Sequence, residues 1–101
     1  MYGSPLKSVS GKGGKFLISF DDPTRINYAV IKENIKTGER IRSWKLEGHA
    51  KEGWVEMGSA RSIGHKRIVD FETGEFDKVR LSIGRYEAIP VIDLFSVGLK
   101  Q

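Results

Sequence analysis

Apolar side chains recur at every second position in short runs, and this spacing limits the possible folds of the chain more than any other feature. Residues 78–83 show it best, because Val79, Leu81 and Ile83 alternate with polar side chains. A strand points successive side chains to opposite faces, so such a run buries one face of a sheet. Long windows show no helical spacing, and twelve glycines interrupt the sequence. The pattern predicts an all-β domain.

Seven runs are predicted as strands, and their short connections favour antiparallel pairing. They are residues 15–20, 27–35, 39–48, 54–57, 66–71, 78–83 and 89–97. The sequence Asp21–Asp22–Pro23 is expected to end the first strand, because proline cannot donate to a ladder. Ile41 is out of phase with Trp44 and Leu46, which predicts a bulge or a strand start near it.

The length of 101 residues fits one domain, with 39% hydrophobic and 30% charged residues as in soluble globular chains. Residues 15–101 are predicted as that domain. Residues 1–14 are polar and rich in glycine, so they are predicted to be a flexible lead-in or an expression-derived remnant, and they lack the apolar segment of a signal peptide. No apolar run reaches the roughly 18 residues of a membrane span.

The residue types give little indication of a catalytic site or a metal site. There is no cysteine, and the two histidines cannot supply the ligands of a zinc site. No nucleophile elbow is present, and most carboxylates fall on predicted turns or exposed strand faces, so no catalytic residue is predicted. No cofactor is predicted. Asp21–Asp22 is a weak candidate for structural calcium, against which an ordinary acidic turn is favoured.

The net charge of +4 comes from 17 basic and 13 acidic residues that are mixed along the sequence, as in Lys32–Glu33. A solvated surface is the expected reason for this mixture. The densest basic cluster, His65–Lys66–Arg67, has no interleaved aromatic residues, so nucleic acid is not a predicted partner. Pairing of this cluster with Asp70 and Glu33 is the structural alternative to ligand contact there.

Four segments follow one another in an order shared with a known family. They are NYAVIKENIKTGERIRSWKLEG from residue 27, GWVEMGSARSIGHKRIVDF from residue 53, DKVRLSI from residue 77 and AIPVIDLFSVGL from residue 88. In this order the chain resembles the C-terminal module of family 29 α-L-fucosidases. His65 stands where that family usually has a tyrosine.

The resemblance implies an antiparallel jelly-roll β-sandwich of the discoidin-like, galactose-binding-domain-like kind, similar to coagulation factor C-type domains and family 32 carbohydrate-binding modules. The first strands of that fold are expected to be truncated or degenerate before Phe16. The implied parent is a secreted or periplasmic α-L-fucosidase with a separate catalytic barrel. The module itself would be a monomeric, non-catalytic accessory domain. Its implied partners are the barrel and fucosylated or galactosylated glycans, and the alternative is a structural domain that packs on the barrel without binding sugar.

A sugar site pairs an aromatic face with planar hydrogen-bonding groups, often on loops. The candidate ligand-binding residues are His65, Arg67, Arg85, Tyr86 and Trp54. Arg85 and Tyr86 are expected at a loop tip, whereas Trp54 has core or edge packing as its alternative. Trp44 is expected in the core.

One ion pair is also expected across the predicted turn at residues 36–38. Glu33 and Arg40 flank this turn, and as an exposed pair they would contribute about 0–1 kcal/mol.

Overall fold

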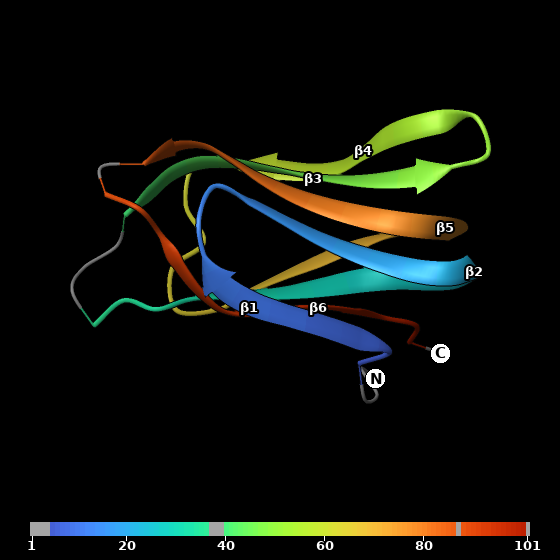
Figure 1. The fold of residues 1–101 in the computed structure, drawn as a ribbon, viewed down its shortest axis with the longest axis horizontal. Helices are drawn as coiled ribbons and strands as arrows, with labels where there is room; N and C mark the ends of the chain where they lie inside the picture. The colour runs from blue at the N-terminus through green and yellow to red at the C-terminus, as the bar shows by residue number, and fades with distance from the viewer. Residues whose placement is uncertain (1–4, 37–39, 87, 101) are drawn as a thin grey trace.

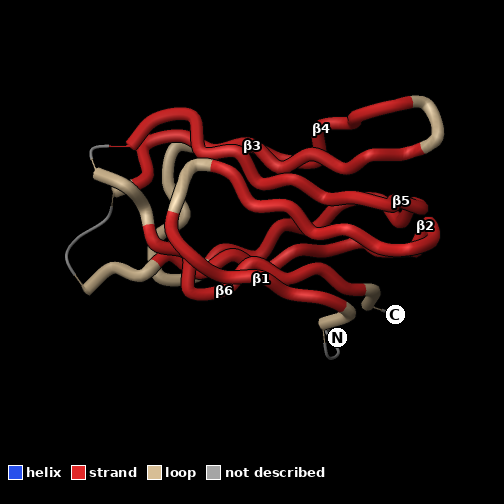
Figure 2. The backbone as a smooth tube through the Cα atoms, in the orientation of Figure 1, coloured by secondary structure: helices blue, strands red, loops and turns tan. Residues whose placement is uncertain are grey.

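The computed structural model describes residues 5–36, 40–86 and 88–100, which form six strands and contain no helix. The strands are β1 (Lys7–Lys12), β2 (Lys15–Glu33), β3 (Ile41–Ala50), β4 (Gly53–Ala60), β5 (Arg67–Tyr86) and β6 (Val91–Gly98). Figure 2 shows these strands joined by short loops that gather at the two ends of the molecule. The all-β, helix-free fold predicted from the alternating pattern is confirmed.

All strand pairs are antiparallel, and the strand order is β1-β6-β2-β5-β3-β4. The strands β2 and β5 have 19 and 20 residues. Straight strands of that length would measure about 60 Å, whereas the longest dimension of the molecule is 36 Å. The two long strands therefore bend, and the register between them is interrupted after Ser19 and after Ile26.

The bends divide the sheet into two layers. Layer A contains residues 15–19 of β2 and 78–82 of β5 together with β3 and β4. Layer B contains residues 28–33 of β2 and 67–70 of β5 together with β6 and β1. Figure 1 shows β3 and β4 at the top of the view, β1 and β6 at the bottom, and the long strands between them. Strands that change sheet at a bend are typical of sandwiches, and two four-stranded layers match a jelly roll of the galactose-binding type.

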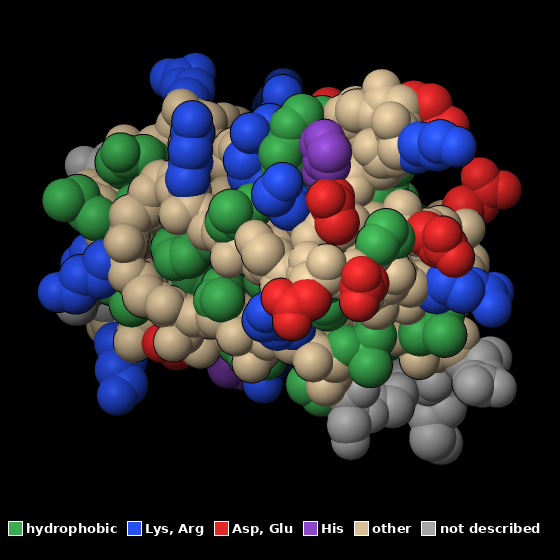
Figure 3. Space-filling view, turned by 45° about the vertical axis from the view of Figure 1, so that its right-hand side comes forward, with side chains coloured by type: hydrophobic (Ala, Val, Ile, Leu, Met, Phe, Trp, Pro, Cys, Tyr) green, Lys and Arg blue, Asp and Glu red, His purple; other side chains and the backbone are tan. Residues whose placement is uncertain are grey.

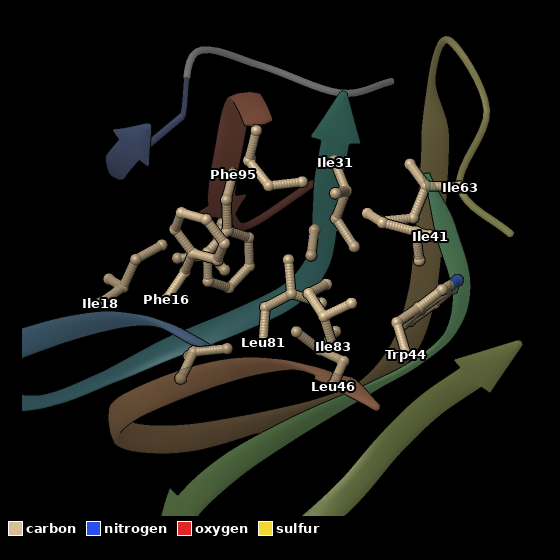
Figure 4. Close-up of a cluster of buried hydrophobic side chains, with 14 of the residues drawn as sticks. Phe16, Ile18, Ile31, Ile41, Trp44, Leu46, Ile63, Leu81, Ile83 and Phe95 are labelled. Carbon is tan, nitrogen blue, oxygen red and sulfur yellow. The ribbon is translucent and has the colours of Figure 1, made fainter. Parts of the chain in front are cut away.

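The core lies between the two layers and receives the inward-facing half of each alternating run. Ile18 and Leu46 from layer A and Ile31 and Phe95 from layer B are fully buried there (Figure 4). Trp44 joins them at 3% exposure, as predicted, and donates its indole N–H to the carbonyl of Ser62 at 3.0 Å. Burial of alternate side chains on both layers supplies the apolar free energy that holds the sandwich together.

Six strands are found among the described residues where seven were predicted, because two pairs of predicted strands are each one bent strand and β1 was not predicted. The predicted break at Asp21–Asp22–Pro23 is wrong, since β2 runs through it. Pro23 lies where the ladder between β2 and β5 is interrupted between Ser19 and Thr24, so its missing N–H removes no pairing bond. These three residues therefore mark a bend within one strand, whereas the prediction was the end of a strand.

Two further segments compare with the prediction in different ways. Residues 7–12 form β1, which pairs with β6, although the sequence predicts a flexible lead-in or a remnant over residues 1–14. As an edge strand, β1 is held by backbone pairing and needs no apolar pattern, so its polar sequence did not indicate a strand before Phe16. Near Ile41, register shifts in the pairing of β3 with β5 confirm the predicted irregularity. The predicted turn at residues 36–38 falls largely outside the described residues.

Candidate functional site

Among the predicted ligand-binding residues, Trp54 lies at one end of layer A, and Arg85 and Tyr86 lie at the other. Arg85 and Tyr86 end β5, and Tyr86 pairs with Ile41 at the first position of β3. Trp54 instead pairs with His49 near the turn between β3 and β4. A span of eight strand residues corresponds to about 26 Å. The structure therefore does not bring Trp54 together with Arg85 and Tyr86.

The end that carries Arg85 and Tyr86 is built from several connections between strands, which we call the loop end. It consists of residues 12–15, 34–36 with 40–42, 61–67, and 84–86 with 88–91. Backbone hydrogen bonds join these segments: Gly13 donates to Pro90 at 3.1 Å, and Asn34 donates to Val91 at 2.9 Å. These segments lie at the left of Figure 1. The connections support one another, so their side chains are held on a common surface.

The loop end contains a hollow of about 400 Å³, lined by Lys12, Asn34, Lys36, Arg40, Ile89 and Val91. The guanidinium Nη1 of Arg40 donates to the carbonyl of Ile89 at 2.9 Å. The side-chain oxygen of Asn34 accepts from the N–H of Lys36 at 3.1 Å, and its amide nitrogen donates to Asp93 at 3.3 Å. The hollow therefore combines oriented polar groups with an apolar wall.

His65 and Arg67 also belong to the loop end, where both are exposed. The guanidinium carbon of Arg67 lies 5.8 Å from the centre of the Trp44 ring. A cation at this distance over an indole is favourable by about 0.5–1 kcal/mol at an exposed site. The structural alternative was that the basic cluster pairs with Asp70 and Glu33. Instead, Asp70 binds the ammonium of Lys100 at 2.6 Å, and Glu33 binds backbone amides.

Glu33 is the last residue of β2, and its side chain is 2% exposed. Its Oε2 accepts the backbone N–H of Arg40 at 2.8 Å and of Ile41 at 3.3 Å. Its Oε1 has no hydrogen-bond partner among the described residues. The expectation that Glu33 is exposed is therefore wrong. Its carboxylate is buried and fixes the start of β3.

Charge is segregated along the molecule. The loop end holds nine of the 17 Lys and Arg residues: Lys12, Lys15, Lys36, Arg40, Arg42, Arg61, Lys66, Arg67 and Arg85. The described residues of these segments include no Asp or Glu, while Glu39 and Glu87 fall outside the described residues. The opposite end carries a mixture of charges in which acidic residues outnumber basic ones: Asp21, Asp22, Glu52, Asp70, Glu72, Glu75 and Asp77 lie there with Arg25, Lys51, Lys78 and Lys100. Figure 3 brings this opposite end forward, and most acidic side chains in view gather over its right half.

The outer face of layer A carries a second group of side chains, which sequence reasoning did not connect. Arg80 donates from Nη2 to Oε1 of Glu47 at 2.8 Å, and its guanidinium carbon lies 3.9 Å from the centre of the Trp54 ring. His49 lies edge-on to Trp54 at 5.1 Å and contacts Asp77 through Nδ1 at 2.7 Å. Trp54 remains 39% exposed. It therefore packs at the sheet edge, against charged neighbours.

These contacts keep two carboxyl groups ionised. The hydrogen bond from Arg80, with the positive charge of Lys45, lowers the pKa of Glu47. The hydrogen bond from His49 lowers the pKa of Asp77. Glu47 stands opposite Glu56 in the ladder between β3 and β4. A catalytic acid in a glycosidase needs a raised pKa, so the environment of Glu47 is the reverse of what that role requires.

Metal and membrane features are few. Across the part of the chain that the structure describes, no cluster of three His, Asp or Glu side chains is placed to hold a metal ion. Asp21 and Asp22, the weak calcium candidates, are exposed. No helix among the described residues is long and apolar enough to cross a membrane.

The chain was compared with known protein families, sequences and structures. No family model matches the chain. A crystal structure assigned as an α-L-fucosidase of Bacteroides thetaiotaomicron VPI-5482 superposes with a TM-score of 0.93 over 97% of this chain, at 35% identity. A protein of Oryza sativa subsp. japonica assigned as α-L-fucosidase 1 is 28% identical over 83 residues, 82% of this chain. Over most of its length, this chain is similar to one part of proteins assigned as α-L-fucosidases.

The match to these α-L-fucosidases covers a minor part of their length, 23% of the bacterial chain and 16% of the rice protein. The fold also resembles a family 32 carbohydrate-binding module of a family 31 glycoside hydrolase, solved with bound GalNAc. That superposition has a TM-score of 0.66 at 14% identity, and it covers 88% of this chain and 68% of the module. This second likeness bears on the fold alone.

Proposed function

We propose that this chain is a non-catalytic accessory module of an α-L-fucosidase, and that it binds carbohydrate. The observation that carries the proposal is the superposition of 97% of this chain on 23% of an α-L-fucosidase-like chain. Three quarters of that longer protein lies outside the match, which leaves ample length for a catalytic domain. The likeness to a carbohydrate-binding module shows that the fold is one that such modules also adopt.

The carboxylates of the described residues support the absence of catalysis. Retaining glycosidases need two carboxyl groups about 5–5.5 Å apart, one of them an acid with a raised pKa. Glu47 and Glu56 are opposed in register, but Arg80 holds Glu47 as an ionised carboxylate on the face of a sheet. We therefore assign hydrolysis to the remainder of the parent enzyme.

Carbohydrate binding is assigned to the loop end. Arg85, Tyr86, His65 and Arg67 lie there, and Tyr86 offers an aromatic ring that is 44% exposed. We leave Trp54 out of this proposed site, because it lies at the other end of layer A. A single weak site of this kind acts by raising the effective concentration of the tethered catalytic domain at the glycan.

The test is a titration of the 101-residue chain with fucosylated and galactosylated oligosaccharides, followed by amide and indole chemical shifts. We expect saturable shifts at Arg85 and Tyr86 with an unmoved Trp54 indole, and no hydrolysis of 4-nitrophenyl α-L-fucoside. Turnover that Glu47→Gln removes would overturn the non-catalytic assignment. Absence of shifts with every glycan would overturn carbohydrate binding.

A purely structural role is the second candidate, and the outer face of layer B favours it. Val30 stands at its centre, paired with Ile68 on one side and Ser96 on the other. Ile68 is 40% exposed, and charged side chains such as Lys32 and Asp70 lie at the margin of this face. Val30 and Ile68 leave apolar surface on this face between Lys32 and Asp70, while Ser96 is 2% exposed. Such an apolar patch suits packing on a catalytic domain. Loss of a complex with the excised catalytic domain on Ile68→Asp, without any glycan response, would support this role.

A further inference from the structure

We propose that the loop end recognises the anionic substituents, sulfate or carboxylate, of a charged polysaccharide. This inference deepens the proposed carbohydrate-binding function and rests on it. The site is the hollow between Lys12, Asn34, Lys36 and Arg40, beside the exposed Ile89. Its ligand differs from a neutral fucosylated glycan in that charge, rather than hydroxyl recognition alone, supplies the affinity.

The first step of the argument is electrostatic. Nine Lys and Arg residues lie at the loop end, and Asp93 is a described carboxylate beside its hollow, where it accepts from the side-chain amide of Asn34 at 3.3 Å. Lys12 and Lys36 have no carboxylate partner within the described ranges. A surface of one sign concentrates ligands of the other sign and accelerates their association.

The second step is the preorganisation of the hollow. The bond from Arg40 to the carbonyl of Ile89 fixes the guanidinium at the rim, and its planar fork suits an oxyanion. Glu33 accepts the backbone N–H of Arg40 and so fixes the main chain beneath that side chain. The amide of Asn34 is held between Lys36 and Asp93. The two lysines are flexible point charges that can follow different spacings of substituents.

The third step concerns the size and the apolar wall of the hollow. Its volume of about 400 Å³ admits a substituted monosaccharide ring. Ile89, 60% exposed, and Val91 offer a surface for the C–H face of that ring. Single-stranded nucleic acid would need several exposed rings for base stacking. Tyr86 is the one exposed large aromatic side chain among the described residues at this end.

The test is affinity electrophoresis of the 101-residue chain in gels that contain a sulfated fucan, polygalacturonate or neutral dextran. We expect strong retardation by one or both anionic polymers and none by dextran. The sulfated and the uronic polymer separate the two sources of charge. The Lys12→Ala, Lys36→Ala double variant should bind about tenfold more weakly, with the salt dependence of log affinity reduced by about two.

The matched control is the Lys51→Ala, Lys78→Ala double variant, which loses the same charge near the acidic end. Its affinity should stay within about twofold of the parent chain. Equal loss in both double variants, or equal retention on single-stranded DNA, would show general polyanion attraction and overturn the inference. Binding of neutral fucosylated glycans alone would overturn it while leaving the proposed function intact. Binding of no glycan would overturn both.

Discussion

At the scale of single residues, three carboxylates are placed for three different tasks. Glu33 is buried and holds backbone amides, Glu47 is tied to Arg80 beneath an exposed tryptophan, and Asp77 is paired with His49. The sequence presents all three as ordinary acidic residues near turns or on strand faces. Their partners come from other strands, so their roles depend on strand pairing.

Replacement of Glu33 with alanine should destabilise the domain. The change leaves the amides of Arg40 and Ile41 without their acceptor in a buried position, at a cost of about 2 kcal/mol. Urea unfolding at neutral pH measures it. The control is Glu56→Ala at an exposed position, where a change within about 0.5 kcal/mol is expected. Equal free energies of unfolding for the two variants would contradict a structural role for Glu33.

Acid should destabilise the domain through Glu47 and Asp77. The folded-state pKa of each lies below its ordinary value of 4.5 or 3.8, so the folded state favours the ionised form. The stabilisation is therefore complete above these ordinary values and is lost as pH falls through the lowered ones. Urea unfolding between pH 6 and pH 2 measures this loss. In Glu47→Gln the decline should be shallower, and an unchanged slope would refute the assignment to Glu47.

At the scale of secondary-structure elements, the bends in β2 and β5 decide the architecture. Each long strand supplies a segment to both layers, so six strands build the eight segments of the sandwich. The bend in β5 places Phe76 over Gly48 of β3. The absence of a side chain at that point lets the aromatic ring close the core.

Gly48→Ala should be destabilising for that reason. A Cβ atom at this position would lie 2.6 Å from Cδ1 of Phe76, which forces the ring out of its place. Overpacking of this kind costs about 1–3 kcal/mol, and thermal unfolding measures it. Gly14→Ala is the matched control, because its Cβ would make an ordinary 3.5 Å contact with Tyr86. A smaller penalty in a Phe76→Leu background is also expected, and an undiminished one would point to a different cause.

At the scale of the whole molecule, the two layers are covalently continuous while the two ends are electrically different. Antiparallel strands return every second connection to the same end, which is how charges mixed along the sequence become separated in space. The mixture of charges along the sequence therefore does not carry over to the folded molecule. The loop end is basic, and the end formed by the strand bends is acidic.

The layers should unfold together, because β2 and β5 run through both. Native-state hydrogen exchange should give opening free energies within about 1 kcal/mol for residues 16–18 in layer A and 29–31 in layer B. The edge strand β4 pairs on one side, with β3, and should open locally at a lower free energy. Exchange of all layer B amides at a much lower free energy than those of layer A would show two independent units.

The sequence by itself determined the all-β class, the inward-facing side chains of the clearly alternating runs, and the irregularity at Ile41. These follow from a period of two and from turn residues, which are local properties of the chain. The sequence did not place Ile26, Ile63 and Phe76 in the core, where the structure has them. The expected loop tip at Arg85 and Tyr86 is wrong, because both residues end β5 and pair with β3. Their role in binding stays a prediction.

Only the tertiary structure decided which residues from distant parts of the sequence become neighbours. The pairing of Arg80 with Glu47 and Trp54, the hollow around Arg40, and the polar strand β1 all require contacts between residues far apart in the sequence. Strand register is set by the packing of the whole sheet, and no local pattern contains it. The local spacing therefore specifies the faces of each strand, and the fold specifies its neighbours.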